Sequence, residues 1–299
     1  MKKLYTLHTL FTLLSLFTLL SLFSCEKAID FKLENSKPLL VVDAEIENNK
    51  APRVVLSNSI SYYSQVSADV FAKSFVHDAD VSISNGTVTQ KLIEYSYPIT
   101  PEYNAYYYGI DSSSLNNAFI GELNTTYDLK IIVDGNEYHS TTTIPNFNVV
   151  PDSVYFKPTP QSPDSNKRSL FLEATDPQGL GNYIRYFTKK NEQPYYPGPN
   201  SVFTDEIIDG TSFTVQLEQG INRNSPPHCS NYFFKSDTIT FKLCNINRST
   251  YKFWNTWEFL NQSIGNPFSQ PGKVEGNITN GALGSFCGYA AWYKTIIVQ

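Results

Sequence analysis

The chain has 299 residues and a formal net charge of −5, from 23 Lys and Arg against 28 Asp and Glu. This length suits two modest domains or one large one. The mildly acidic balance, with no basic cluster, disfavours nucleic-acid binding, because phosphate contacts need clustered Lys and Arg. Abundant Tyr, Phe, Thr and Ser favour strands over helices, since aromatic and β-branched side chains suit a half-buried pleated sheet.

The N-terminal segment resembles an export signal. Lys2 and Lys3 precede an uncharged run of Leu, Phe, Thr and Ser over residues 10–23, and Ser24-Cys25 follow. The run is short for a membrane span, which needs about 20 apolar residues. A cysteine directly after such a run is where bacterial lipoproteins are cleaved and acylated. We therefore predict a lipoprotein signal peptide over residues 1–24 and lipidation of Cys25. An ordinary secretory signal or a signal anchor is the alternative.

Residues 25–37 are charged and lack periodicity, which predicts a tether. Beyond them, alternating apolar and polar residues predict strands, and Asn85-Gly86 and Asp134-Gly135 predict hairpin turns. The predicted strands cover 39–46, 53–56, 80–84, 87–95, 127–133 and 137–144. About seven short strands with regularly spaced turns favour a β-sandwich of the immunoglobulin or transthyretin kind over residues 38–147.

Tyrosines gather in two segments that we predict to be loops, at 96–117 and 193–200. They could form a stacking platform for a sugar or hot spots for a protein partner, because binding residues concentrate in loops. Packing over the sheet edges explains them equally well. The candidate binding aromatics are Tyr103, Tyr106, Tyr107, Tyr108, Tyr195 and Tyr196.

A second β-rich domain is predicted over residues 148–299, because Pro145 and Pro151 disfavour a central strand between them. Its main helix is predicted near residues 250–262, with Ser249 as N-cap and Gly265-Asn266-Pro267 as the stop. Trp254 and Trp257 fall on the apolar side of this helix and are expected to pack in the core. The predicted strands cover 170–174, 183–187, 212–217, 237–244 and 290–298.

Three cysteines remain if Cys25 carries lipid. Cys229 and Cys244 flank an alternating run, and an exported protein meets an oxidising compartment, so a disulfide between them is possible. Cys287 would then be unpaired. The alternative is that all three are buried free thiols, since free Cys packs as a small hydrophobe.

We find no set of residues that predicts catalysis, a metal or a cofactor. His77, His139 and His228 do not have zinc-ligand spacing, and nucleophile-elbow, phosphate-loop and dinucleotide motifs are missing from the sequence. The sequence therefore predicts that the protein is not an enzyme.

Two acidic motifs have a structural and a functional interpretation. Asp78 and Asp80 point to one face of a predicted strand, where they could hold calcium or serve acid–base chemistry. The turn Asp176-Pro177-Gln178-Gly179 could present an oxygen to a cation. We favour a solvated strand end for the first and a type I turn for the second.

Several motifs together resemble one family. The segments 78–83, 135–145 and 176–186, then Tyr251-x-Phe253-Trp254 and the Gly/Asn-rich stretch 265–284, occur in the order seen in the domain-of-unknown-function 4249 lipoproteins of Bacteroidota-type bacteria. The resemblance covers almost the whole mature chain and transfers no catalytic residue. It implies an outer-membrane lipoprotein, often encoded beside TonB-dependent receptors.

These expectations define two candidate functions. The first is a lipid-anchored outer-membrane accessory or binding protein at the cell surface that works beside a TonB-dependent receptor in substrate capture. The second is a free-standing glycan- or surface-binding module.

Overall fold

The computed structural model describes residues 37–61, 67–116, 118–223, 232–266 and 272–299. Contacts divide the chain into two units, residues 1–37 and 38–299, and only the second is described below. The predicted signal peptide, Cys25, the predicted tether up to residue 36 and Cys229 lie outside the described residues. No helix of the described residues is long and apolar enough to cross a membrane.

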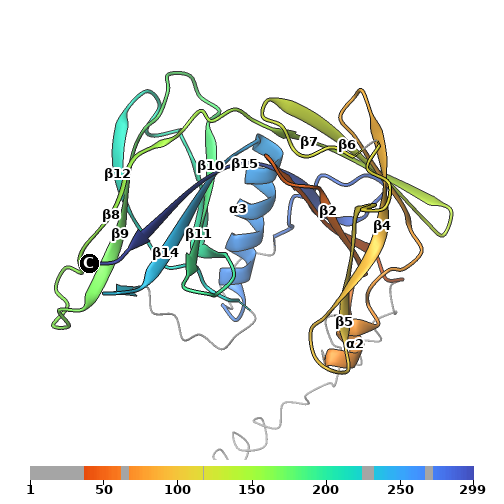
Figure 1. Ribbon diagram of the computed structural model, residues 1–299, viewed down its shortest axis with the longest axis horizontal. Helices are drawn as coiled ribbons and strands as arrows, with labels where there is room; N and C mark the ends of the chain where they lie inside the picture. The colour runs from red at the N-terminus through yellow and green to blue at the C-terminus, as the bar shows by residue number, and fades with distance from the viewer. Residues whose placement is uncertain (1–36, 62–66, 117, 224–231, 267–271) are drawn as a thin grey trace, which may run out of the picture. The chain divides into compact units, whose positions relative to one another are not determined.

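The second unit is mainly β, which confirms the predicted fold class of a sandwich-type β protein with one short helix near residue 250. Eleven described strands form one long sheet (Figure 1). In spatial order they are β11 (Tyr196–Thr204), β10 (Tyr183–Lys190), β14 (Thr238–Ile246), β15 (Leu283–Ile297), β1 (Leu40–Glu47), β2 (Arg53–Asn58), β5 (Asn104–Ile110), β4 (Thr89–Pro98), β3 (Asp80–Ser84), β6 (Thr125–Val133) and β7 (Asn136–Ile144).

A second, four-stranded sheet faces one end of the long sheet. It contains β8 (Pro151–Pro158), β9 (Lys167–Thr175), β12 (Ser212–Leu217) and β13 (Phe233–Phe234). A core of Leu170, Leu172, Phe241 and other apolar residues fills the space between the two sheets. A separate core lies among β1 to β7 and includes Phe286 of β15.

The strand β1 joins the two halves of the unit. It pairs in parallel with β15, with Val41 opposite Leu283 and Glu47 opposite Tyr289. The predicted domain boundary between residues 147 and 148 does fall in the connection from β7 to β8. However, one sheet takes strands from both sides of that boundary. Contacts therefore group residues 38–299 into one unit, whereas the sequence analysis divided them into two domains.

A glycine allows β7 to pack across β15. A Cβ atom at Gly288 would lie 2.5 Å from the backbone oxygen of Thr143, a distance that real Cβ atoms do not show. Only glycine leaves room for the two backbones to approach this closely. The strands β1 to β7 and β15 therefore curl around the first core.

The described residues form two helices, α2 (Ala68–Ala72) and α3 (Arg248–Ser263). The helix α3 begins earlier than predicted, because Asn247 and not Ser249 is its N-cap and accepts a hydrogen bond from the Thr250 backbone N–H. It contacts β10, β11 and β15, as Figure 1 shows. Trp254 and Trp257 are half-buried and Phe259 is 63% exposed, so the aromatic residues of α3 are not fully in the core.

Candidate functional site

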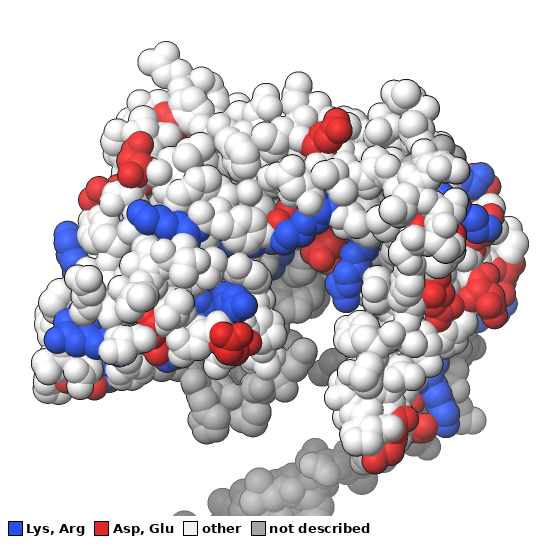
Figure 2. Space-filling view, in the orientation of Figure 1, with Lys and Arg blue, Asp and Glu red and all other residues white. Residues whose placement is uncertain are grey.

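A charged and aromatic cleft lies beside α3, on the face of the long sheet opposite its main cores. Its volume is about 360 Å³. We call it the α3 cleft and define it by ten of its lining residues: Asp43, Glu45, Arg185, Phe187, Tyr196, Pro197, Arg223, Trp254, Trp257 and Tyr289. Figure 2 shows acidic and basic side chains meeting in the hollowed middle of the molecule.

Strand alternation places the polar floor of this cleft. On β1, Val42, Ala44 and Ile46 are buried in the first core, so Asp43 and Glu45 point to the opposite face. The same alternation on the neighbouring strand puts Phe286 in the core. Residues from strands far apart in sequence thus face one cleft because their strands share one sheet.

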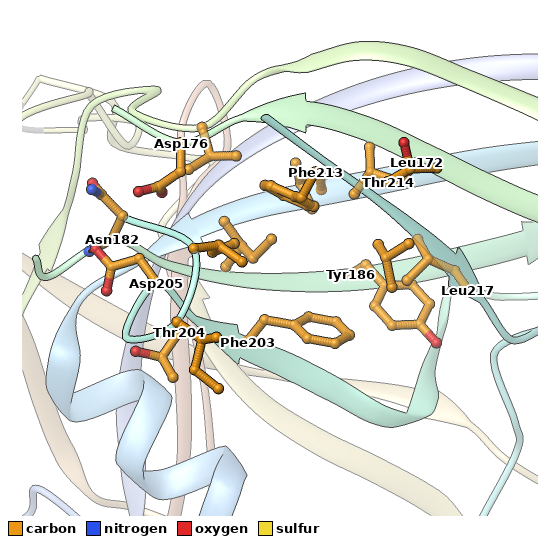
Figure 3. Close-up of a pocket in the computed structure, with 16 residues that line it drawn as sticks. Leu172, Asp176, Asn182, Tyr186, Phe203, Thr204, Asp205, Phe213, Thr214 and Leu217 are labelled. Carbon is orange, nitrogen blue, oxygen red and sulfur yellow. The ribbon is translucent and has the colours of Figure 1, made fainter. Parts of the chain in front are cut away.

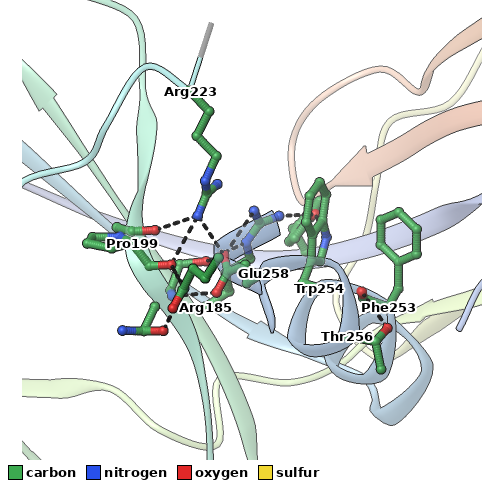
Figure 4. Close-up of polar contacts among 12 residues, drawn as sticks. Arg185, Pro199, Arg223, Phe253, Trp254, Thr256 and Glu258 are labelled. Atoms are coloured by element: carbon green, nitrogen blue, oxygen red, sulfur yellow. Dashed lines mark hydrogen bonds and ion pairs between the residues drawn. The ribbon is translucent and has the colours of Figure 1, made fainter. Parts of the chain in front are cut away.

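A stacked arginine forms one wall. The Arg185 guanidinium lies 3.5 Å from the ring centroid of Trp254 and 4.7 Å from that of Phe187. The Tyr289 hydroxyl oxygen accepts a hydrogen bond from Arg185 Nη1 at 3.1 Å and another from Trp254 Nε1 at 2.8 Å. These contacts fix the guanidinium plane and the indole ring in one orientation (Figure 4).

A buried glutamate balances this arginine. Glu258 of α3 is 3% exposed, and its Oε1 lies 4.0 Å from Arg185 Nη2 and accepts a hydrogen bond from Arg223 Nη2 at 3.3 Å. The backbone N–H and the hydroxyl of Ser201 also donate to the Glu258 carboxylate. A buried carboxylate with this many donors holds its partners in place. Figure 4 shows the resulting network.

Two carboxylates face the open part of the cleft. Solvent reaches Glu45, whose side chain is 49% exposed and ion-paired with Arg53 at 3.8 Å. Surrounding protein nevertheless desolvates Asp43 and Glu45 and raises the pKa of each carboxyl; Arg53 opposes this rise, and Asp43 adds to it at Glu45. Among the described residues, no hydrogen bond or ion pair to the Asp43 carboxylate is found. Asp43 can therefore accept a hydrogen bond from a ligand.

The predicted tyrosine platform is not assembled. The expected loop around Tyr106 to Tyr108 is the strand β5, and alternation sends neighbouring side chains to opposite faces. Tyr106 packs against Phe75 and His77, while Tyr107 stacks on Tyr95.

The other candidate aromatics also lie apart. Tyr108 is 2% exposed and its hydroxyl donates to the Val76 carbonyl, so it belongs to the core. Tyr103 is half-buried at the turn before β5. Tyr195 packs edge-on against Tyr293, whereas Tyr196 lines the α3 cleft. Of the six tyrosines, Tyr196 alone is among the residues that line this cleft.

The described cysteines are buried free thiols. Cys244 and Cys287 both lie in the small core beneath α3. The possible disulfide between Cys229 and Cys244 stays a prediction, because Cys229 lies outside the described residues; Cys244 itself is a free thiol. The Cys244 side chain lies on the face of β14 that packs with Ile246 and Ala291.

The Asp78 and Asp80 pair has a structural explanation. Asp78 adopts a positive φ of 58° at the bend before β3, and Asp80 forms an ion pair with Lys91 across the hairpin at 2.9 Å. Both are consistent with the solvated strand end that we favoured from the sequence.

Sequence reasoning missed the residues that build the α3 cleft. Arg185 interrupts an aromatic strand, and Glu258 lies four residues after Trp254 on the helix. A charge placed within an apolar face is a signal for a buried ion pair, because unpaired charges are costly to bury. Asp43-x-Glu45-x-Glu47 is a second signal, since three acidic residues then share one face of a strand.

Comparison with protein families identifies a match over most of the chain. The family described as "Domain of unknown function (DUF4249)" matches residues 26–294. No curated protein matches the chain. The family match includes every described residue of the α3 cleft, from Asp43 to Tyr289. The chain therefore belongs to the DUF4249 family.

Proposed function

We propose that this protein is a lipid-anchored outer-membrane accessory or binding protein, and that the α3 cleft is where it contacts its ligand. The observation that carries the proposal is the cleft itself. Its walls are held rigid by the Arg185–Glu258 network, while Asp43 faces the opening without a partner among the described residues. Preorganised walls lower the entropy cost of binding.

The lining indicates the class of ligand. The Asp43 and Glu45 carboxylates accept hydrogen bonds, Arg223 donates them, and Trp257 offers an aromatic surface. This mixture suits a polar molecule with hydroxyl or amino groups on a compact apolar frame, such as a sugar. A free-standing glycan-binding module would use the same cleft, so this second candidate shares the first experiment below.

The anchoring part of the proposal comes from the sequence. The segment 1–24, with Cys25 after it, has the pattern of a bacterial lipoprotein signal. Lipid on Cys25 would keep the β-rich unit at the membrane, because multiple acyl chains give stable attachment. We further propose a TonB-dependent receptor as the partner that takes over the captured substrate.

A binding experiment tests the cleft. Purified protein is applied to a glycan array, and hits are measured by calorimetry with the variants Asp43→Asn and Trp257→Ala. We expect each variant to weaken binding about tenfold or more, since one lost charge-assisted hydrogen bond is worth about 1.5–3 kcal/mol. Glu102→Gln, in the exposed turn before β5, is the matched control and should bind normally. Unchanged affinity in both cleft variants would show that the ligand binds elsewhere.

A second experiment tests the anchor and the partner. Cys25→Ala should abolish labelling by a radioactive fatty acid and remove the protein from its usual membrane fraction. Affinity purification of the wild-type protein from membranes should recover a TonB-dependent receptor. Persistent lipid labelling of Cys25→Ala would refute the anchor, and recovery without any β-barrel partner would count against the receptor.

A further inference from the structure

Three aspartates from two loops converge at one end of a second cavity, separate from the α3 cleft. Asp176 directly follows β9, whereas Asp205 and Asp209 lie in the connection from β11 to β12. One carboxylate oxygen of each lies within 4.8 Å of the other two. Figure 3 shows Asp176 and Asp205 with Asn182 at this end, while Phe203, Phe213 and Leu217 line the apolar part. We call the three carboxylates the aspartate cluster.

Two of the three aspartates are buried, and the cluster lacks a balancing charge among the described residues. Asp176 is 2% exposed and Asp205 is 1% exposed. Burial raises the pKa of Asp176; a hydrogen bond from the Gly210 backbone N–H opposes this, and the charges of Asp205 and Asp209 add to it. No ion pair found among the described residues involves any of the three aspartates. Like charges held this close in a buried place need a cation or a proton.

One oxygen of the cluster has no partner at all. Asp205 Oδ2 accepts hydrogen bonds from the backbone N–H groups of Gly181 and Asn182, each at 2.8 Å. The other oxygen, Oδ1, is buried without a hydrogen-bond partner in the structure. The hydroxyl oxygen of the preceding residue, Thr204, is also buried and unpartnered. Buried polar atoms are normally satisfied, so the orphaned carboxylate oxygen of Asp205 points to a missing ligand.

The geometry decides what that ligand is. Calcium binds oxygen at about 2.3–2.6 Å, so two of its ligands lie at most about 5 Å apart, and the spacing within the aspartate cluster meets this limit. The donor set consists of three carboxylates, without His or Cys, which suits a hard cation and not zinc. Magnesium demands a near-octahedral shell and retains water, whereas calcium tolerates irregular loop ligands.

We propose that Asp176, Asp205 and Asp209 bind one Ca²⁺ ion. The ion would neutralise the three carboxylates and give Asp205 Oδ1 its missing partner. It would also tie the turn after β9, which belongs to the four-stranded sheet, to the end of β11 in the long sheet. The site is therefore a clamp between the two sheets at the mouth of the cavity.

Calorimetry and thermal unfolding test this site. The full chain in detergent is freed of metal on a chelating resin and titrated with CaCl₂ up to 10 mM, with MgCl₂ in parallel. We expect one Ca²⁺ per chain and a dissociation constant between about 10⁻⁶ and 10⁻³ M. A hundredfold excess of Ca²⁺ over Kd should raise the unfolding temperature by about 5–10 °C.

Variants make the test specific. Asp205→Asn removes the charge of the most buried ligand, and Asp209→Asn changes an exposed ligand whose loss should leave folding intact. Both should lose Ca²⁺ binding and the temperature shift. Glu206→Gln, the exposed neighbour of Asp205, is the matched control and should retain both.

Three results would overturn the proposal: no heat or temperature shift with wild-type protein, an unchanged shift in Asp209→Asn, or an equal response to Mg²⁺. If lowering the pH raised the unfolding temperature of the protein while Ca²⁺ did not, the aspartate cluster would hold a shared proton instead of a metal ion. None of these measurements depends on a ligand in the α3 cleft, so the two proposals succeed or fail separately.

Discussion

At the scale of single residues, the buried arginine and glutamate beside α3 are held as a pair. Arg185 is 2% exposed and Glu258 is 3% exposed, and each is surrounded by hydrogen-bond partners. Such pairs contribute little net stability compared with apolar residues of the same size. Removing one member is costly, however, because the other is left buried and uncompensated.

Glu258→Ala should therefore destabilise the fold strongly. The substitution leaves the buried Arg185 charge without its carboxylate partner. We therefore expect a loss of about 3–5 kcal/mol in the free energy of unfolding, measured by urea denaturation. Lys252→Ala on the same helix breaks only the exposed ion pair with Glu275. That control should change stability by about 0–1 kcal/mol. Equal effects of the two variants would mean that the Arg185–Glu258 pair does not hold α3.

The two buried thiols should be chemically inert in the folded protein. Burial raises the pKa of Cys244 to about 12 and also raises that of Cys287. Because the thiolate is the reactive form, both should resist a thiol reagent such as DTNB from pH 7 to pH 9. With Cys25 and Cys229 replaced by Ser, we expect no rapid reaction of the native protein and two reactive thiols after denaturation. Rapid native labelling would show that this core opens.

At the scale of elements, β1 places three carboxylates on one face in opposite electrostatic environments. The surrounding protein desolvates the Asp43 and Glu45 carboxylates and raises their pKa above the ordinary values of 3.8 and 4.5, although both side chains reach solvent. Burial also tends to raise the pKa of Glu47, but the adjacent Lys242 charge and hydrogen bonds from Lys242, Lys50 and Tyr293 outweigh it and lower that pKa. One strand thus carries two carboxylates that disfavour ionisation and one that favours it.

This difference predicts opposite pH effects. A raised folded-state pKa means that stability present below the ordinary pKa is lost as pH rises through the folded value. Asp43→Asn and Glu45→Gln should therefore raise the urea midpoint only slightly at pH 7, because solvent screens both exposed carboxylates, and leave it unchanged at pH 3. Glu47→Gln should lower the midpoint at pH 7, and its effect should fade as acid protonates Glu47. The same direction of change in all three variants at pH 7 would contradict these environments.

At the scale of the whole molecule, the pairing of β1 with β15 makes the two halves depend on each other. Phe286 and Ala290 of β15 complete the core among β1 to β7. A fragment covering residues 38–147 lacks that strand, and we expect it to remain unfolded by circular dichroism. The unit 38–299 should unfold in one calorimetric transition. Two separated transitions, or a folded 38–147 fragment, would support the two-domain interpretation.

Local sequence patterns determined the strands and the main helix. Alternation over residues 39–46 and 137–144, the Asn-Gly and Asp-Gly turns, and the aromatic periodicity around Trp254 all depend on neighbours in the chain. Even there, the pattern failed at residues 104–110, where consecutive tyrosines hid a strand because both of its faces are partly covered. It failed again at residues 196–204, where the predicted Pro/Gly/Tyr loop is the strand β11. The N-cap was misplaced by two residues because Ser249 and Asn247 are both good caps.

Only the tertiary structure decided which residues meet. The α3 cleft combines Asp43, Arg185, Trp254 and Tyr289, and the aspartate cluster combines Asp176 with a loop about 30 residues later. These meetings depend on the parallel pairing of β1 with a strand near the other end of the chain and on the stacking of two sheets. Such long-range contacts leave no periodicity in the sequence, because nothing in the spacing of residues along β1 specifies the distant strand that completes its hydrogen bonds.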